Sequence, residues 1–342
     1  MDFELMKKLS EADGVSSDEG EVAGIMAASM KKAGLKTEID DVGNLIAYKS
    51  LGKKPLVVGA HMDEIGLMVK HIDEKGFVRF IIIGGIDKRT LINQQVTVRT
   101  QKGLIPGVIG FKPIHLLREE ETKTAIDAKS LFIDVGAKDC KEAETMGVEI
   151  GNTITFNAPF RRMGKKMLTG KALDDRVGCY AICKLAEDLP PNVVLMGTTQ
   201  EEVSLFGKGA AMANYRLEPR AFITADTTIA GDHPEVKPEE APIFLGKGPA
   251  LCLVEWGARG NVANKKLVRS FVDSAREEKI GLQIEVIDGG ASDAMSVNTV
   301  RGGIPSIAVN VPVRYIHSAM GVAHEDDVDD TVRLLKRIIR EL

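Results

Sequence analysis

Short apolar runs recur along the chain, and polar residues follow many of them closely. Residues 193–197 form such a run, which predicts a buried strand, and a polar stretch then leads to the adjacent carboxylates Glu201 and Glu202. Elsewhere apolar residues return at the spacing of an amphipathic helix, most clearly in residues 326–342. The alternation of buried strands with amphipathic helices predicts an α/β fold.

Helix start and stop signals extend this pattern. Ser16 and Ser17 precede acidic residues, an order typical of a capped helix start, and Gly34 is typical of a helix end. Asp174 and Asp175 are expected to begin a further helix, after a segment that contains Gly170. The predicted helices cover residues 2–10, the stretch between Glu19 and Gly34, and residues 138–146, 176–188, 207–213, 264–278 and 326–342.

The pattern changes between residues 66 and 160. Short alternating runs, separated by turns such as Gln101-Lys-Gly103, predict a β-rich and barrel-like module. This segment contains no cluster of metal-binding residues, and the α/β pattern resumes after it. We therefore expect residues 66–160 to be an inserted domain that packs against other subunits. It interrupts a discontinuous α/β domain formed by residues 1–65 and 161–342.

Composition narrows the functional classes. The chain has 342 residues, 44% of them hydrophobic, and its formal net charge of −4 comes from acidic and basic residues mixed along the chain. This mixed charge excludes the basic surface typical of nucleic-acid-binding proteins and a polybasic membrane anchor. No apolar run approaches the ~18 residues of a membrane span, and the amino terminus lacks signal-peptide architecture. Four cysteines without a CxxC pair form no disulfide framework. We expect a soluble cytoplasmic protein that binds neither nucleic acid nor membrane.

Acidic and imidazole side chains gather at the ends of the expected strands. Glu201 and Glu202 alone could be a solvated pair that opens a helix, where the helix dipole favours them. The repetition indicates a shared site instead, because ligands and chemistry gather beyond the carboxyl ends of strands in an open α/β sheet. The candidates are His61, Asp174, Asp175, Glu201, Glu202, Asp226 and His317.

These residue types point to metal-assisted hydrolysis. Mixed carboxylate and imidazole ligands suit two divalent ions, and the imidazoles favour zinc or cobalt over magnesium. One aspartate can bridge such a pair, which leaves a further carboxylate free to act as a base. Two ions ~3.5–4 Å apart lower the pKa of a water between them and polarise a carbonyl group for attack. Hydrolysis of an amide is implied, but the order of residues alone does not say which amide.

Five sequence strings resemble those of one known family, in the same order. They are His61-Met-Asp-Glu-Ile-Gly66, Lys171-Ala-Leu-Asp-Asp-Arg176, Gln200-Glu-Glu-Val203, Ala225-Asp226 and Arg314-Tyr-Ile-His317-Ser318. With them the chain resembles the M42 family of metallo-aminopeptidases, which includes the tetrahedral aminopeptidases of archaea and the bacterial glutamyl aminopeptidases. The resemblance runs over nearly the whole chain, including an inserted β-domain between the first two strings.

The resemblance implies a fold and a role for each matching residue. The fold would be a mixed-sheet α/β domain of the dimetal exopeptidase type with an inserted β-barrel-like dimerisation domain. Two divalent ions, zinc or cobalt, would be bound in each subunit. By this resemblance one ion is held by His61 and Asp226, the other by Glu202 and His317, both by the bridging Asp174, while Glu201 is the general base and Asp63 orients His61.

The resemblance also implies partners. The substrates would be peptides with a free amino terminus, from which the enzyme removes the first residue. Members that resemble this chain form dimers through the β-domain, and many assemble further into hollow tetrahedral dodecamers. A homo-oligomer is therefore expected.

The chain departs from the family pattern outside the proposed ligands. Residues 203–210 form a longer segment than is usual after Glu202, and residues 319–322 replace a usual proline and glutamate. These differences bear on substrate preference and assembly. His233 and Asp293 are candidates for substrate binding, and the alternatives are an ordinary loop residue and a helix-capping aspartate, respectively.

Two other functions stay open at this point. Dimetal hydrolases of other amides, such as deacylases and carboxypeptidases, share the same ligand set, so the ligands do not discriminate between them. A scaffold that has lost catalysis and keeps only its assembly would require a missing ligand or base, and none is missing from the motifs.

Overall fold

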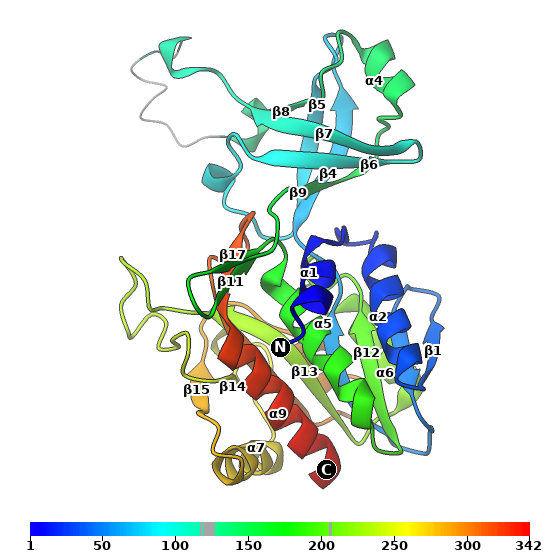
Figure 1. Cartoon of the computed structure of the whole chain (residues 1–342), viewed down its shortest axis with the longest axis vertical. Helices are drawn as coiled ribbons and strands as arrows, with labels where there is room; N and C mark the ends of the chain where they lie inside the picture. The colour runs from blue at the N-terminus through cyan, green and yellow to red at the C-terminus, as the bar shows by residue number, and fades with distance from the viewer. Residues whose placement is uncertain (117, 119–126, 205–206) are drawn as a thin grey trace. The chain divides into compact units, whose positions relative to one another are not determined.

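The computed structural model describes residues 1–342 except 117, 119–126 and 205–206. The described part of the chain forms two compact units (Figure 1). The first comprises Met1–Glu64, Pro159–Ile316 and Met320–Leu342, and the second comprises Ile65–Ala158 and His317–Ala319. Among the described residues, no helix combines the length and the apolar character needed to cross a membrane.

A mixed β-sheet forms the centre of the first unit. Its strands are β1 (Lys36–Ile39), β2 (Leu45–Tyr48), β3 (Leu56–His61), β10 (Arg161–Met163), β11 (Met167–Gly170), β12 (Val193–Thr198), β13 (Ala221–Ile229), β14 (Ala250–Val254), β15 (Gln283–Val286), β16 (Ser306–Arg314) and β17 (Gly321–His324). The order is β1-β2-β12-β3-β13-β16-β17-β11-β10, with β14 paired to β16 and β15 to β14. The middle strands β12, β3, β13 and β16 run parallel to one another, and antiparallel strands extend the sheet on both sides.

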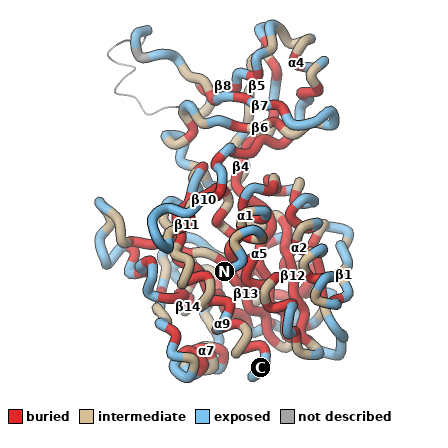
Figure 2. Tube along the Cα trace, in the orientation of Figure 1, coloured by how far each residue is buried: buried red, intermediate tan, exposed pale blue. Residues whose placement is uncertain are grey.

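Helices cover both faces of this sheet, so β3 and β12 are buried throughout and β13 and β16 are buried except near their last residues. The helices are α1 (Phe3–Glu11), α2 (Gly20–Lys32), α5 (Leu173–Leu185), α6 (Lys208–Leu217), α7 (Lys265–Glu277), α8 (Asp293–Asn298) and α9 (Glu325–Glu341). Successive residues of a strand point to opposite faces. Val58 therefore packs in the core that contains side chains of α1, α2, α5, α7 and α9, whereas Val57 packs in the core that contains those of α6 and α8. Figure 2 shows β12 and β13 as buried over most of their length.

Two helix starts differ from their prediction. The residue that precedes α2 is Glu19, and no side chain caps that helix; the hydroxyl of Ser16 donates to Asp63 instead. Asp174 and Asp175 fall at the start of α5, but both have non-helical backbone angles. Local sequence suggested ordinary helix starts because it does not reveal long-range hydrogen bonds.

The second unit is a closed antiparallel barrel, which confirms the predicted barrel-like module. Its strands are β4 (Gly66–Ile72), β5 (Val78–Ile83), β6 (Gln95–Thr100), β7 (Gly103–Gly110), β8 (Phe132–Asp134) and β9 (Thr153–Phe156), joined in the order β4-β5-β8-β7-β6-β9. Alternate residues such as Val96 and Val98 are fully buried inside it. Leu104 and Val108 on β7 remain exposed, and helix α4 (Cys140–Met146) follows the capping residue Asp139.

Single 3₁₀ turns complete the secondary structure of the described residues. They lie at Lys88–Thr90, Ile114–Leu116, Ala128–Ser130, Ala186–Asp188 and Trp256–Ala258.

Candidate active site

Most of the predicted site residues meet at one edge of the parallel sheet. His61 is the last residue of β3, and its partner in the register is Thr198, the last residue of β12. Because neighbouring parallel strands end at the same edge, the loop with Glu201 and Glu202 begins beside His61. Asp226 was expected to end its strand, but β13 continues to Ile229.

The imidazole of His61 lies at the centre of the cluster. Its Nε2 atom is 3.2 Å from Oδ1 of Asp174 and 3.8 Å from Oδ1 of Asp226. Candidate ligand atoms of His61, Asp174 and Glu202 all lie within 4.8 Å of one another. Burial opposes protonation of His61, but the hydrogen bonds with Asp174 and Asp63 raise its pKa well above the ordinary value.

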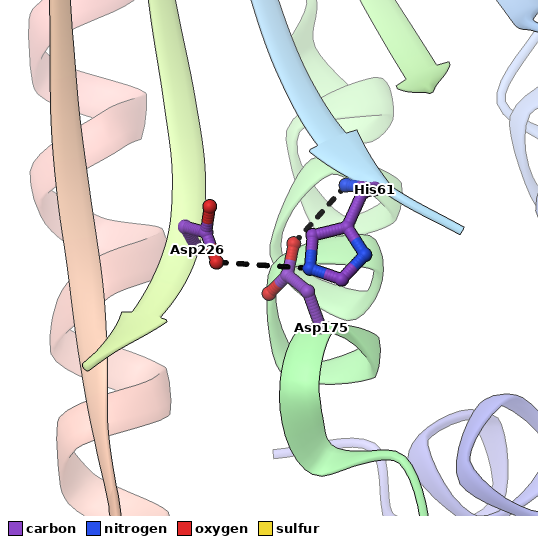
Figure 3. A group of neighbouring side chains, drawn as sticks. All are labelled: His61, Asp175 and Asp226. Atoms are coloured by element: carbon purple, nitrogen blue, oxygen red, sulfur yellow. Dashed lines mark hydrogen bonds and ion pairs between the residues drawn. The ribbon is translucent and has the colours of Figure 1, made fainter. Parts of the chain in front are cut away.

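Asp175 belongs to a second group of candidate ligands, with His61 and Asp226 (Figure 3). Both of its carboxylate oxygens accept backbone N–H groups, Oδ2 from His61 at 3.2 Å and Oδ1 from Gly178 at 3.0 Å. Asp175 is fully buried, whereas 14% of the Asp174 side chain is exposed. Both aspartates were candidates from the sequence, and the family resemblance implied a specific role only for Asp174.

Asp63 joins the end of β3 to the loop after β12. Its carboxylate accepts the N–H groups of Glu201 and Glu202, at 3.0 and 3.2 Å, and the hydroxyl of Ser16 at 2.6 Å. Nδ1 of His61 lies 3.1 Å from the Asp63 carbonyl oxygen and 3.5 Å from Oδ1 of its carboxylate. Asp63 is therefore placed to hold both the ring of His61 and the backbone of the glutamate pair.

Negative charge accumulates around Glu201. Burial raises the pKa of Glu201 well above its ordinary value; His61 opposes this rise, and Asp226, Asp293 and Glu202 add to it. Burial likewise raises the pKa of Asp226 to about 7. Each of these carboxylates is thus harder to ionise than it is in water.

The donor set of this cluster fits divalent metal ions. A bound cation favours the ionised form of neighbouring carboxylates, which is the form that burial and mutual repulsion penalise here. Imidazole nitrogen and carboxylate oxygen are also common zinc ligands. The two overlapping groups around His61 therefore have the chemistry and the spacing of a metal centre.

His317 falls in the second compact unit rather than in the first. Within that unit its Nδ1 atom lies 2.7 Å from the carbonyl oxygen of Gly85. The groups of candidate ligands found among the described residues do not include it. Its assignment as a ligand stays a prediction.

The two candidate substrate-binding residues have different surroundings. His233 is half-buried in the segment after β13, and its ring centre lies 5.4 Å from that of Tyr315. Asp293 is 1% exposed and accepts a hydrogen bond from the hydroxyl of Thr198. The side chain that caps α8 is Ser292, so capping does not explain Asp293. Residues 205–206 of the long segment after Glu202 lie outside the described residues.

Comparisons with known proteins agree with the geometry. A sequence model of the M42 glutamyl aminopeptidase family matches residues 43–334. The lysyl aminopeptidase of Pyrococcus furiosus is 36% identical, over 100% of this chain and 98% of its own length. A solved aminopeptidase from Desulfurococcus kamchatkensis is 38% identical with a TM-score of 0.93, covering 99% of this chain and 94% of that one.

A third relative has also been solved as an assembly. The TET1 peptidase of Pyrococcus horikoshii, which can form a tetrahedron or a large octahedral shell, is 31% identical with a TM-score of 0.89. That alignment covers 99% of both chains. The family match, the full-length relatives and the fold all confirm the resemblance carried by the sequence strings. The chain therefore belongs to the M42 family of metal-dependent aminopeptidases.

Proposed function

We propose that the protein is a dinuclear metallo-aminopeptidase that removes amino-terminal residues from peptides. The observation that carries this proposal is the convergence of candidate ligand atoms from His61, Asp174, Glu202 and Asp226 at one sheet edge. Membership of the M42 family supports the same reaction.

We assign the ligands as the family motifs imply. His61 and Asp226 would hold one ion, Glu202 and His317 would hold the other, and Asp174 would contribute to both. The position of Nε2 of His61, near both Asp174 and Asp226, supports the first set. Asp175 is less suited to be the bridge, because both of its oxygens already accept backbone N–H groups.

The reaction needs a base next to the ligands, and Glu201 meets that requirement. Two divalent ions, zinc or cobalt, would supply Lewis acidity toward the scissile carbonyl and would lower the pKa of the attacking water. Glu201 would take the proton of that water and give it to the leaving amine, a transfer typically worth about 10²–10⁴-fold in rate. Asp63 would keep His61 and the Glu201 backbone in place through the contacts described above.

Substrate and assembly are the less constrained parts of the proposal. The substrates are peptides with a free amino terminus, and His233 and Asp293 are candidate contacts for them. A homo-oligomer built from dimers, with a tetrahedral dodecamer as one form, is supported by the assembly of the TET1 relative. The cysteines are all free thiols, which suits a reducing cytoplasmic location.

One panel of substrates separates this function from its rivals. Metal-free protein is titrated with zinc and with cobalt and is assayed on aminoacyl reporters, on matched reporters with a blocked amino group, and on an acylated and a carboxy-terminal reporter. We expect metal-dependent release only from substrates with a free amino group. Release from the acylated reporter would indicate a deacylase, and release from the carboxy-terminal reporter a carboxypeptidase. Metal binding without any release would indicate a scaffold.

A further inference from the structure

Buried carboxylates accept three consecutive backbone N–H groups in the loop that carries the glutamate pair. The N–H of Gln200 donates to Oε1 of Glu19 at 3.2 Å. The next two, those of Glu201 and Glu202, donate to the two oxygens of Asp63 at 3.0 and 3.2 Å. Asp63 belongs to the family motif, whereas Glu19 lies far from it in the sequence.

The carboxylate of Glu19 is directed to backbone outside α2 rather than to the start of that helix. Glu19 immediately precedes α2, a position where a short polar side chain such as that of aspartate or serine normally caps the first N–H groups of the helix. No such hydrogen bond is formed by Glu19. The same Oε1 that accepts the N–H of Gln200 accepts that of Ser17 at 2.9 Å, and only 6% of the residue is exposed.

Both donors have backbone conformations that need support from their surroundings. Ser17 has a φ of 81° and Gln200 a φ of 58°, which lie in the left-handed region that residues other than glycine adopt at a cost. Glu19 and Gln200 also line a cavity of about 480 Å³ together with Gly43. Because a cavity lies on this side of the loop, packing contacts support the loop less there, and hydrogen bonds contribute more to holding its conformation.

The turn before α2 is itself anchored to the end of β3. Val15 forms a parallel bridge with Glu64, and the hydroxyl of Ser16 donates to Asp63 at 2.6 Å. The turn from Val15 to Glu19 therefore contacts Asp63 through the side chain of Ser16 and the Gln200 backbone through the side chain of Glu19. Through these contacts it fixes the backbone on which Glu201 is carried.

We infer that Glu19 is a positioning residue, which holds the Gln200 peptide so that the side chain of Glu201 points correctly for proton transfer. This inference rests on the proposed role of Glu201 as the base. Glu202 keeps its own bond to Asp63 when Glu19 is changed, so metal binding should not depend on Glu19.

The decisive variant is Glu19→Asp. Aspartate is a favoured residue before a helix, so α2 should be kept or stabilised, but the shorter side chain cannot reach the N–H of Gln200 as glutamate does. Glu19→Gln keeps the length and an acceptor oxygen. Asn264→Ala is the control, because it removes the side-chain cap of α7 in the same unit and leaves this loop unchanged.

Two measurements are made on the metal-loaded protein. The first is amide hydrogen exchange in peptides that cover residues 198–203, and the second is steady-state hydrolysis of an aminoacyl reporter with metal content determined in parallel. For Glu19→Asp we expect faster exchange and a kcat lower by about 10- to 100-fold, with KM and metal content nearly unchanged. Glu19→Gln should keep the exchange rate and the kcat close to those of the parent protein. Asn264→Ala should alter neither quantity.

The outcomes separate this inference from the proposed function. Unchanged exchange in Glu19→Asp, or faster exchange with an unchanged kcat, overturns the positioning role. Loss of metal in that variant does so too, because Glu19 would then act through Glu202. If the parent protein does not cleave the reporter, the proposed function fails, and hydrogen exchange still decides whether Glu19 holds the loop.

Discussion

Glu201 and Glu202 are adjacent in the chain, and the proposed mechanism uses Glu202 as a metal ligand and Glu201 as the base. Replacing Glu201 by Gln should keep both ions bound and lower the rate by roughly three orders of magnitude or more, as expected for loss of a general base. Metal content of the purified variant, measured beside kcat, checks this. If the metal disappears together with the activity, the roles of the two glutamates are reversed.

Asp174 and Asp175 offer a matched pair of substitutions at neighbouring positions. Asp174→Asn should weaken the binding of both ions, because the proposed bridge is shared, whereas His317→Ala should empty chiefly one site. Asp175→Asn should retain two ions and lower thermal stability, since the NH2 group that replaces one carboxylate oxygen cannot accept the N–H group, of His61 or of Gly178, that bonds to that oxygen. Calorimetric titration of metal into the metal-free variants measures how many ions each variant binds and how tightly. Equal losses from Asp174→Asn and Asp175→Asn would contradict the bridging assignment.

Glu255 gives a prediction about pH at a residue outside the proposed ligands. Burial raises its pKa from 4.5 to about 7, although Ser292 donates a hydrogen bond to it. A carboxyl with a raised folded-state pKa favours folding while it is protonated, and this contribution is lost as the pH rises through that pKa. In metal-free protein, Glu255→Gln should therefore gain melting temperature relative to the parent between about pH 5 and about pH 7.5. A melting-temperature difference between the variant and the parent that stays constant over this pH range would contradict the raised pKa of Glu255.

The sequence revealed which acidic and imidazole side chains lie near the ends of apolar runs, and this was enough to nominate His61, Glu202 and Asp226, although Asp226 lies three residues before the end of β13. It could not reveal the partners of Ser16, because the bridge between Val15 and Glu64 brings Ser16 beside Asp63 from a distant part of the chain. Contacts of this kind depend on tertiary pairing. Local sequence therefore indicated a helix cap where the structure has a support for the site.

At the scale of elements, periodicity predicted α9 and the barrel strands well, because each buries one regular face. Val328 and Leu335 are fully buried on α9, and alternate residues of β6 fill the barrel. The start of α5 was predicted less well. Its aspartates have non-helical angles and bond to the site, so tertiary contacts there override the helical signal.

Arg176 on α5 joins several elements in the core of the first unit. It is fully buried and donates to the carbonyl oxygens of Leu9 and Ala12 at the end of α1, and to that of Met62 after β3. Its guanidinium also lies 3.5 Å from the carboxylate of Glu64. Arg176→Met should therefore lower the free energy of unfolding by about 3–5 kcal/mol, because it leaves a buried charge and several carbonyl groups with fewer partners.

Urea unfolding of the metal-free protein measures this loss. Arg340→Met is the matched control, since Arg340 is exposed and its nearest carboxylate, on Asp188, is 3.9 Å away. An exposed pair of this kind contributes at most about 1 kcal/mol. Similar unfolding free energies for the two variants would show that the buried arginine does not connect these elements energetically.

At the scale of the whole molecule, the barrel is proposed to hold the assembly together without contributing to the chemistry. Leu104 and Val108 are 61% and 45% exposed on β7, an arrangement that association would cover. Leu104→Asp combined with Val108→Asp should give smaller particles that still bind metal and cleave a short aminoacyl reporter. Lys129→Asp, which changes charge at an exposed polar position of the same unit, is the control.

Light scattering after size-exclusion chromatography, run beside the reporter assay, gives the answer. Loss of both assembly and cleavage in the double variant would mean that the barrel supports the chemistry as well. A monomeric parent protein would rule out the proposed role of the barrel altogether.

The pairing of β4 with β9 has a consequence for how such a chain can evolve. Leu67 lies opposite Ile154 in this pair, so the chain enters and leaves the barrel on neighbouring strands. A module whose two ends are adjacent can be inserted into a host fold, exchanged or shortened with little demand on the connecting peptide. Selection can thus alter the barrel surface, which is proposed to form the contacts of the assembly, while the sheet edge that carries the proposed ligands is inherited unchanged.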